Sequence, residues 1–184
     1  MRIMKKLRVR VSKIFASAAM TAALFFLGVL LVGAGAVGRL WCAMYIAGHK
    51  SQQLITEGPY SMSRNPLYFF SLLGSVGVGL CTETLCVPLL IAGAFAVYYP
   101  LVIRGEERRL EAKHGGAFAA YRARTPAFVP KASLLMEPER FVVHPRMYRL
   151  ALVQTPWFVW LIGVLELFEE LQRWDALPTL FHLY

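Results

Sequence analysis

The sequence predicts an all-α membrane protein with about four to five transmembrane helices and one amphipathic helix at the cytoplasmic surface. Of its 184 residues, 57% are hydrophobic and 17% are charged, whereas soluble domains have roughly 45 to 50% and about 25%. The apolar residues also form blocks of membrane length: residues 14–38 and 150–165 carry no charge, and residues 65–103 carry only Glu83. These features exclude a large soluble catalytic domain, a disordered scaffold and a DNA-reading module. We expect a single membrane domain over residues 1–184.

The first apolar block has several interpretations. A basic start followed by an apolar run is typical of a signal peptide, but 25 charge-free residues exceed the usual length of about 7 to 15. We therefore expect a retained helix. It either crosses once or breaks at Gly33, Gly35 and Gly38 into two short helices, residues 14–31 and 37–48. We expect the break, because it leaves the basic segments on both sides of the block in the cytoplasm.

The middle block predicts a helical hairpin. One helix over residues 65–103 would be about 58 Å long at ~1.5 Å per residue, nearly twice a ~30 Å hydrocarbon core. It would also hold Glu83 near the bilayer centre, at about 2.5 to 3.5 kcal/mol. A turn at residues 81–84 removes both problems and leaves residues 58–68 and 104–130 at one membrane face. Ten of the twenty Lys and Arg residues lie in residues 104–149, so we expect this face to be cytoplasmic and Glu83 external.

Beyond the hairpin, residues 104–124 predict an amphipathic helix at the cytoplasmic surface. Glu107, Leu110, His114, Phe118 and Tyr121 recur at spacings of three and four. Residues 131–184 form an extension with a polar connector and a further expected crossing at residues 150–168. The three cysteines and four histidines are scattered along the chain, so no disulfide framework and no metal site is expected.

Two polar segments, one before and one after the hairpin, carry the candidate site. They read GPYSMSRNPLY, residues 58–68, and RGEERRLEAKHGGAFAAYRARTPAFVP, residues 104–130. The hairpin brings together the side chains that can hydrogen-bond or ionise: Tyr60, Arg64, Asn65, Tyr68, Glu106, Glu107 and Tyr121. A purely structural interpretation remains open, with Arg64 and Tyr68 as interfacial anchors, Asn65 as a helix N-cap and the glutamates as a solvated pair.

The two segments resemble the integral-membrane methyltransferases that include isoprenylcysteine carboxyl methyltransferase and the phospholipid methyltransferases. That family has a GxYxxxRHPxY segment before a helical hairpin and an EExxLxxxFGxxYxxY…P segment after it. Residues 38–48, GRLWCAMYIAG, also resemble the family's helix with an Arg-x-Trp-like pattern. The resemblance covers residues 38–130. The chain departs from it at Asn65, where the family often has His, and at Phe118, where it has Tyr.

The resemblance implies that the chain binds S-adenosyl-L-methionine without a Rossmann domain. Carried over by position, Arg64 and Glu107 are catalytic candidates, and the cofactor-binding set is Tyr60, Arg64, Asn65, Pro66, Tyr68, Glu106, Glu107 and Tyr121. Arg64 can pair with the cofactor's carboxylate, a glutamate with its ammonium or ribose, and tyrosine rings can face the sulfonium or adenine. We expect Glu107 to point at the pocket and Glu106, about 100° away, to serve a helix N-terminus. Asn65 cannot titrate as histidine does.

The expected partners are membrane lipids and a lipophilic or lipid substrate, with no nucleic acid. The methyl acceptor stays open between a carboxylate on an isoprenoid thioether acid and an amine on a phospholipid. An acceptor with a carboxylate would favour a nearby arginine in the protein. An acceptor with an ammonium must lose a proton and would favour a nearby glutamate or aspartate. The expected location is the bacterial inner membrane, with the site cytoplasmic. The alternative is a small non-catalytic membrane binding or assembly protein on the same scaffold.

Overall fold

The protein is all-helical throughout the part of the chain that is described. The computed structural model describes residues 2–48, 53–155, 160–161, 163–164 and 167. Its elements are α1 (Arg2–Ile46), α2 (Pro59–Met62), α3 (Pro66–Cys81), α4 (Cys86–Arg124), the 3-10 helix η1 (Ala132–Leu134) and α5 (Pro145–Gln154). These residues contain no strand, only one isolated bridge between Gly58 and Met136. The predicted all-α class is therefore confirmed.

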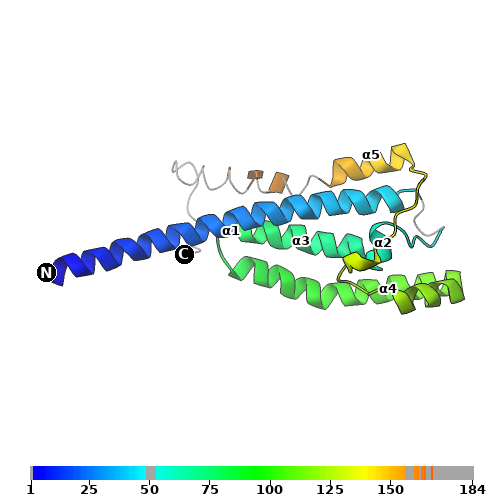
Figure 1. Ribbon diagram of the computed structural model, residues 1–184, viewed down its shortest axis with the longest axis horizontal. Coiled ribbons are helices and arrows are strands. Elements are labelled where there is room, and N and C mark those ends of the chain that lie inside the picture. Colours follow the sequence, from blue (N-terminus) through cyan, green and yellow to red (C-terminus); the bar gives the residue numbers. More distant parts are fainter. Residues whose placement is uncertain (1, 49–52, 156–159, 162, 165–166, 168–184) are drawn as a thin grey trace.

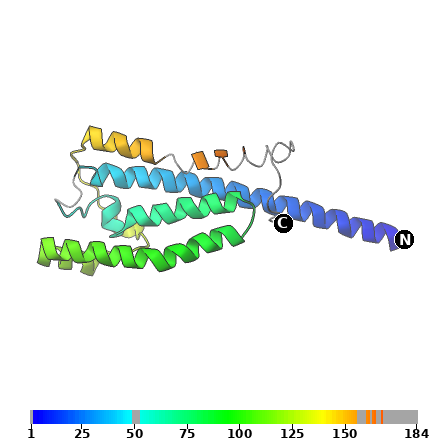
Figure 2. The same cartoon turned by 180° about the vertical axis from the view of Figure 1, so that it is seen from behind.

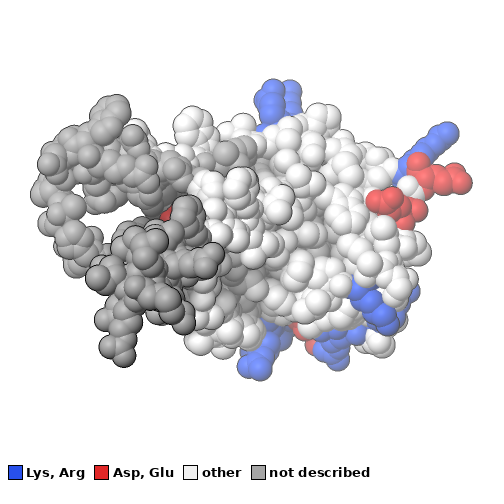
Figure 3. Space-filling model, turned by 60° about the vertical axis from the view of Figure 1, so that its left-hand side comes forward, with Lys and Arg blue, Asp and Glu red and all other residues white. Residues whose placement is uncertain are grey.

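The three long helices lie side by side, with α3 between α1 and α4 (Figure 1). The view from behind shows the same order (Figure 2). One end of this bundle holds α2, η1 and the end of α4, and the other end holds the turn between α3 and α4. We call these the clasp end and the turn end. On the face shown in Figure 3, uncharged side chains cover the centre, and Lys and Arg project at its edges.

The predicted hairpin is confirmed. α3 begins at Pro66 and ends at Cys81, and α4 begins at Cys86. Proline is well suited to the first helical position, because the backbone NH that it lacks has no partner within the helix there. In the turn, the backbone NH of Glu83 donates to the Leu80 carbonyl at 3.0 Å, and Glu83 has a positive φ of 57°. Residues 58–68 and the charged part of α4 consequently meet at the clasp end, as the sequence predicts.

The predicted break in α1 is wrong, since α1 is one helix of 45 residues. Its glycines serve close packing instead. A Cβ on Gly28 would lie 2.6 Å from the Gly77 carbonyl oxygen of α3, and a Cβ on Gly35 would lie 2.6 Å from the Gly74 nitrogen. Small residues let two helix backbones approach in this way. The first residues of α1 therefore lie beyond the turn end, opposite the clasp end (Figure 1).

The amphipathic helix expected at residues 104–124 is not a separate element, because α4 runs on from its apolar part. A reversal occurs inside α4 at Gly115, with φ 48° and ψ −119°. The contacts of Arg64 show the reversal. Its side chain contacts both a carboxylate oxygen of Glu107 and the carbonyl oxygen of Arg122. On a straight helix those residues would be about 22 Å apart at ~1.5 Å per residue. The part after Gly115 therefore folds back along the part before it.

Two described helices are long and apolar enough to cross a membrane, Ala18–Ile46 within α1 and Cys86–Arg124, and α3 is a shorter apolar helix. This is fewer than the four to five crossings expected, since α1 does not break in two and α3, with 16 residues, is shorter than a typical crossing of about 20 residues. α5 occupies the start of the crossing expected at residues 150–168, and residues 156–159, 162, 165–166 and 168 of that stretch lie outside the described residues.

Candidate active site

A set of hydrogen bonds joins residues 58–65 to residues 126–136, and we call this pairing the clasp. Backbone groups make three of the bonds, and side chains of the first segment make the others. The bonds are Gly58 N to Met136 O (2.8 Å), Lys131 N to Met62 O (3.0 Å), Arg64 N to Pro126 O (2.9 Å), Ser63 Oγ to Phe128 O (2.9 Å), Asn65 Nδ2 to Ala127 O (2.9 Å) and Met136 N to Ser61 Oγ (2.9 Å). The clasp fixes the loop after α4 against the start of α3.

Asn65 acts in the clasp and not as a side-chain cap. It occupies the N-cap position of α3, as expected, but its side chain makes no capping hydrogen bond. Its side-chain amide donates to the Ala127 carbonyl, and its backbone NH donates to Ser63 Oγ at 3.2 Å. A histidine at this position can also donate one hydrogen bond. The departure from the family pattern therefore preserves a donor and removes only the titration.

Arg64 ties three parts of the site together. Its Nε donates to Glu107 Oε1 at 2.8 Å, and its Nη1 donates to the carbonyl oxygens of Arg122 (3.0 Å) and Thr125 (2.8 Å). The ion pair is largely shielded from solvent, with 12% and 19% of the two side chains exposed. Arg64 thus uses both edges of its guanidinium on the protein itself, which differs from the free carboxylate clamp expected from the sequence.

Tyr121 closes the site from the reversed part of α4. Its hydroxyl donates to the Tyr60 carbonyl at 2.7 Å and lies 3.5 Å from the Ser63 carbonyl. Phe118, one turn earlier, is fully buried with its ring 6.2 Å from that of Tyr121. The hydroxyl that the family pattern carries at Phe118 is absent here, and the ring fills the core.

These elements enclose a cavity of about 580 Å³ at the clasp end, within the range of roughly 300 to 1,000 Å³ for small-molecule sites. Seven of the eight predicted site residues line it, and the eighth, Pro66, is fully buried and does not line it. The seven are Tyr60, Arg64, Asn65, Tyr68, Glu106, Glu107 and Tyr121. The hairpin therefore brings together the residues that the two sequence segments suggested.

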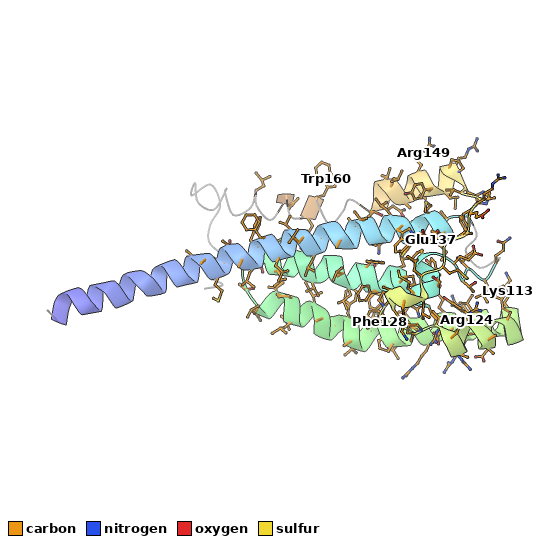
Figure 4. The ribbon with its side chains drawn as sticks, viewed as in Figure 1. Lys113, Arg124, Phe128, Glu137, Arg149 and Trp160 are labelled. Atoms are coloured by element: carbon orange, nitrogen blue, oxygen red, sulfur yellow. The ribbon has the colours of Figure 1, made fainter. Side chains whose placement is uncertain are left out.

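Along α4 the lining of the cavity changes from apolar to charged. Leu101 and Val102 come first, and we call this part the apolar end. The polar end holds the two glutamates, Arg109 and Lys113, with Leu110 among them. Leu67 of α3, Ile46 and residues 54–55 are further apolar parts of the wall. Figure 4 shows Lys113 at the clasp end of the bundle, where Arg124 and Phe128 are also labelled.

The two glutamates have different partners. Glu107 is paired with Arg64, whereas Glu106 Oε2 accepts a hydrogen bond of 2.8 Å from the Tyr68 hydroxyl. Both line the cavity. The expectation that Glu106 serves a helix N-terminus is wrong, because α4 begins twenty residues earlier at Cys86. Since Tyr68 is neutral and Arg64 is charged, Glu106 keeps more of its negative potential for a bound cation.

Tyr60 lies on the cavity wall with a buried hydroxyl that has no hydrogen-bond partner among the described residues. Burial raises the pKa of this hydroxyl well above its usual value. It is therefore protonated at neutral pH and able to donate a hydrogen bond. A buried polar group without a partner is uncommon and is typically satisfied by a ligand or water.

Sequence reasoning did not identify the cavity residues that precede the clasp. Gln53, Leu54 and Ile55 line the cavity but stand in a segment with no periodicity and no matching motif. Arg109 and Lys113 had a signal, because they follow Glu106 at helical spacing. Across the described part of the chain, no three His, Cys, Asp or Glu side chains come close enough to hold a metal ion.

The phospholipid methyltransferase family matches residues 17–116. The cobalt-zinc-cadmium resistance protein CzcN of Cupriavidus metallidurans is 46% identical over 79% of this chain and 67% of its own length. The nickel-cobalt-cadmium resistance protein NccN of Alcaligenes xylosoxydans xylosoxydans is 42% identical over 86% and 74%. No solved structure shows significant similarity. The chain belongs to the phospholipid methyltransferase family.

Proposed function

We propose that the protein transfers a methyl group from S-adenosyl-L-methionine to a lipophilic acceptor at the membrane surface. One observation carries this proposal: the two family segments line a single cavity whose wall contains carboxylates, cations and aromatic rings as well as a set of apolar side chains. The polar end suits the cofactor and the apolar end suits a lipid-like acceptor.

The residues present fit the cofactor. Glu106, whose hydrogen-bond partner is neutral, suits the ammonium. Arg109 and Lys113 suit the carboxylate, because Arg64 is already engaged with Glu107. Rings at Tyr60 and Tyr121 suit the adenine or the sulfonium. Arg64 and Glu107 then position the wall of the site, since they lock the reversed part of α4 to the clasp.

The cofactor supplies an electrophilic methyl group for an in-line displacement. The protein's part is alignment and exclusion of water. The clasp and the reversal at Gly115 fix the cavity walls, and Phe118 with Tyr121 seals the cavity from below the clasp. The apolar end, at Leu101 and Val102, suits the acceptor's hydrocarbon.

We further propose that α1, α3 and α4 all cross the bilayer, that residues 150–168 add a crossing, and that the clasp end is cytoplasmic. Residues 104–149, at the end of α4 and after it, carry ten Lys and Arg residues, against six among the first thirteen residues. Single cysteines at positions 83 and 131, in the chain with its own three cysteines replaced, test this. We expect a membrane-impermeant maleimide to label intact cells at position 83 only. Labelling at 131 alone would place the site outside.

The function is tested with the purified chain in detergent. We expect S-adenosylhomocysteine, the product form of the cofactor, to bind with a calorimetric signal, and labelled methyl to pass to a component of a bacterial lipid extract. Glu106→Gln should weaken S-adenosylhomocysteine binding by about tenfold or more, because it removes the charge facing the ammonium. Glu111→Gln, on an exposed part of the same helix, is the matched control and should bind as the wild type.

No binding of S-adenosylhomocysteine by the folded wild-type chain would contradict the methyltransferase proposal. The relatives' names associate them with resistance to cobalt, nickel, zinc and cadmium. Binding of the cofactor product without methyl transfer to any lipid would favour the non-catalytic alternative, a membrane protein that acts in resistance through a partner.

A further inference from the structure

A second hollow lies at the clasp end, where Figure 4 labels Arg124, and we call it the basic groove. It is open and has a volume of about 750 Å³. Four cationic side chains line it, those of Arg64, Arg122, Arg124 and Lys131, and none of the described residues in its wall is acidic. Arg64 also lines the cavity. The two hollows therefore meet at Arg64.

Two of the four cations carry a charge that the protein does not balance. Glutamates pair with Arg64 at 2.8 Å and with Arg122 at 3.4 Å. Arg124 and Lys131 are exposed and form no ion pair within the described part of the chain. The clasp fixes the backbone of Lys131, whose NH donates to the Met62 carbonyl at 3.0 Å. Positive charges held around one hollow repel each other unless an anion lies among them, so the basic groove is suited to an anion.

The reversal inside α4 sets the depth of the basic groove. Arg64 Nη1 donates to the carbonyl oxygens of Arg122 (3.0 Å) and Thr125 (2.8 Å). The end of α4 therefore lies beside Arg64, which stands two residues before the first residue of α3. We propose above that α3, an apolar helix, crosses the bilayer. Its first residue is then near the boundary between hydrocarbon and headgroups, and the basic groove lies at the level of the headgroups.

Apolar side chains accompany the charges of the basic groove. Val129 and Leu134 line it, and Val129 is exposed, as are the next residues after Leu134, Leu135 and Met136. Exposed apolar side chains beside cations are poorly suited to water. They are well suited to a lipid surface, where the cations meet headgroups and the apolar side chains meet the start of the acyl chains. The apolar side chains therefore favour a lipid over a free phosphate ion or an acidic peptide.

We propose that the basic groove binds the phosphate headgroup of an anionic phospholipid, with Arg124 and Lys131 as its cationic contacts and Val129 against its acyl chains. An arginine offers two parallel donors to a phosphate, and a lysine adds a point charge. This lipid is distinct from the methyl acceptor, because the basic groove is outside the cavity. The inference needs the crossing of α3 but not methyl transfer, and the cysteine labelling at positions 83 and 131 tests that crossing separately.

The test uses phosphatidylglycerol, which is anionic and has neither an amine nor a carboxylate that could accept a methyl group. Retention of the radiolabelled lipid is measured on the immobilised full chain in neutral detergent, with empty micelles subtracted. Phosphatidylcholine with the same acyl chains is the reference without net charge. We expect the wild type to retain phosphatidylglycerol about tenfold better than phosphatidylcholine. The double variant Arg124→Gln, Lys131→Gln should lose most of this preference.

A second double variant separates a defined site from general attraction to a basic surface. Arg108→Gln, Arg140→Gln removes the same charge from exposed residues that line neither hollow, and it should keep the preference. An equal loss in both double variants would overturn the site. Inorganic phosphate and hexaglutamate at the same concentration should not displace the lipid, and displacement by either would overturn the assignment to a phospholipid.

SDS-induced unfolding of the same samples shows whether each variant is folded. A folded Arg124→Gln, Lys131→Gln chain that keeps the full preference would overturn the proposal. If this variant does not fold, the wild type and the second double variant decide. Equal retention of the two lipids by the wild type would refute the basic groove as a lipid site, whereas a preference that survives in Arg108→Gln, Arg140→Gln supports it.

Discussion

Replacing Arg64 by lysine should detach the reversed part of α4 from the clasp. The guanidinium contacts three acceptors, Glu107 Oε1 and the carbonyl oxygens of Arg122 and Thr125. A lysine ammonium cannot reach all three, and we expect it to keep one. Two charge-assisted hydrogen bonds at about 1.5 to 3 kcal/mol each give about 3 to 6 kcal/mol of lost unfolding free energy. We expect the lower value, about 3 kcal/mol, because the contact with the Arg122 carbonyl is exposed.

The assay is a double-mutant cycle of Arg64→Lys and Glu107→Gln, read as SDS-induced equilibrium unfolding in mixed micelles. Residues in direct contact couple by about 0.5 to 3 kcal/mol, and we expect the upper half of this range. Arg122→Gln is the matched control on α4, the helix of Glu107. The Arg122 side chain forms an ion pair of 3.4 Å with Glu111 and is 46% exposed. Exposed pairs of this kind contribute only a few tenths of a kcal/mol.

Two results would refute this reasoning about Arg64. If Arg64→Lys unfolds like the wild type but loses S-adenosylhomocysteine binding, Arg64 clamps the cofactor directly, as the sequence alone suggested. If stability, binding and coupling are all unchanged, Arg64 is only an anchor at the lipid headgroups. A parallel loss of stability and binding supports the tie between α4 and the clasp.

Three further predictions concern positions with matched controls. Gly35→Val should lower the unfolding free energy by about 2 kcal/mol or more, because the added side chain forces α1 away from α3. The control Gly33→Val should be neutral, since a Cβ there meets nothing within 4 Å. Equal effects of the two variants on SDS-induced unfolding would contradict the packing argument. Gly115→Ala should lower the unfolding free energy by about 1 to 2 kcal/mol and weaken S-adenosylhomocysteine binding, because φ is 48° at this position. Gly116→Ala should have neither effect. Unchanged stability and binding in Gly115→Ala would show that the reversal tolerates a side chain. Asn65→His should keep the stability and the S-adenosylhomocysteine binding of the wild type. Asn65→Leu should lower the unfolding free energy by about 1 kcal/mol, because it removes the hydrogen bond to Ala127. A lower unfolding free energy in both variants would mean that the amide does more than donate this bond.

The hairpin was predictable because two features constrain it, the length of the apolar stretch and the single charge of Glu83 within it. A stretch of 39 residues with Glu83 near its middle has few placements in a bilayer, and the structure has the turn there. The pairing of the two polar segments followed from the hairpin alone. Pro66 also marked the start of α3 correctly, because its missing NH is not needed in the first helical turn.

Two of the wrong predictions, the break in α1 and the separate helix over residues 104–124, have one cause: a glycine can have two structural roles. Gly35 looked like a break in α1 and instead allows contact with Gly74, while Gly115 stood in an apparently continuous amphipathic pattern and is the point of reversal. A glycine can relax the backbone or admit a neighbour, and only tertiary contacts decide which. The partners of Arg64 were not predictable for the same reason, since its acceptors at 122 and 125 come within reach only after the reversal.

The clasp has a consequence for how the protein is made. Its bonds pair residues 58–65 with residues that follow them by about sixty positions or more, ending at Met136, whereas the matched phospholipid methyltransferase region is residues 17–116. A chain emerging from the ribosome can insert α1 and the hairpin early, but the cavity wall stays open until residue 136 has been synthesised. A ribosome stalled before that point would display a membrane-inserted chain with an incomplete site.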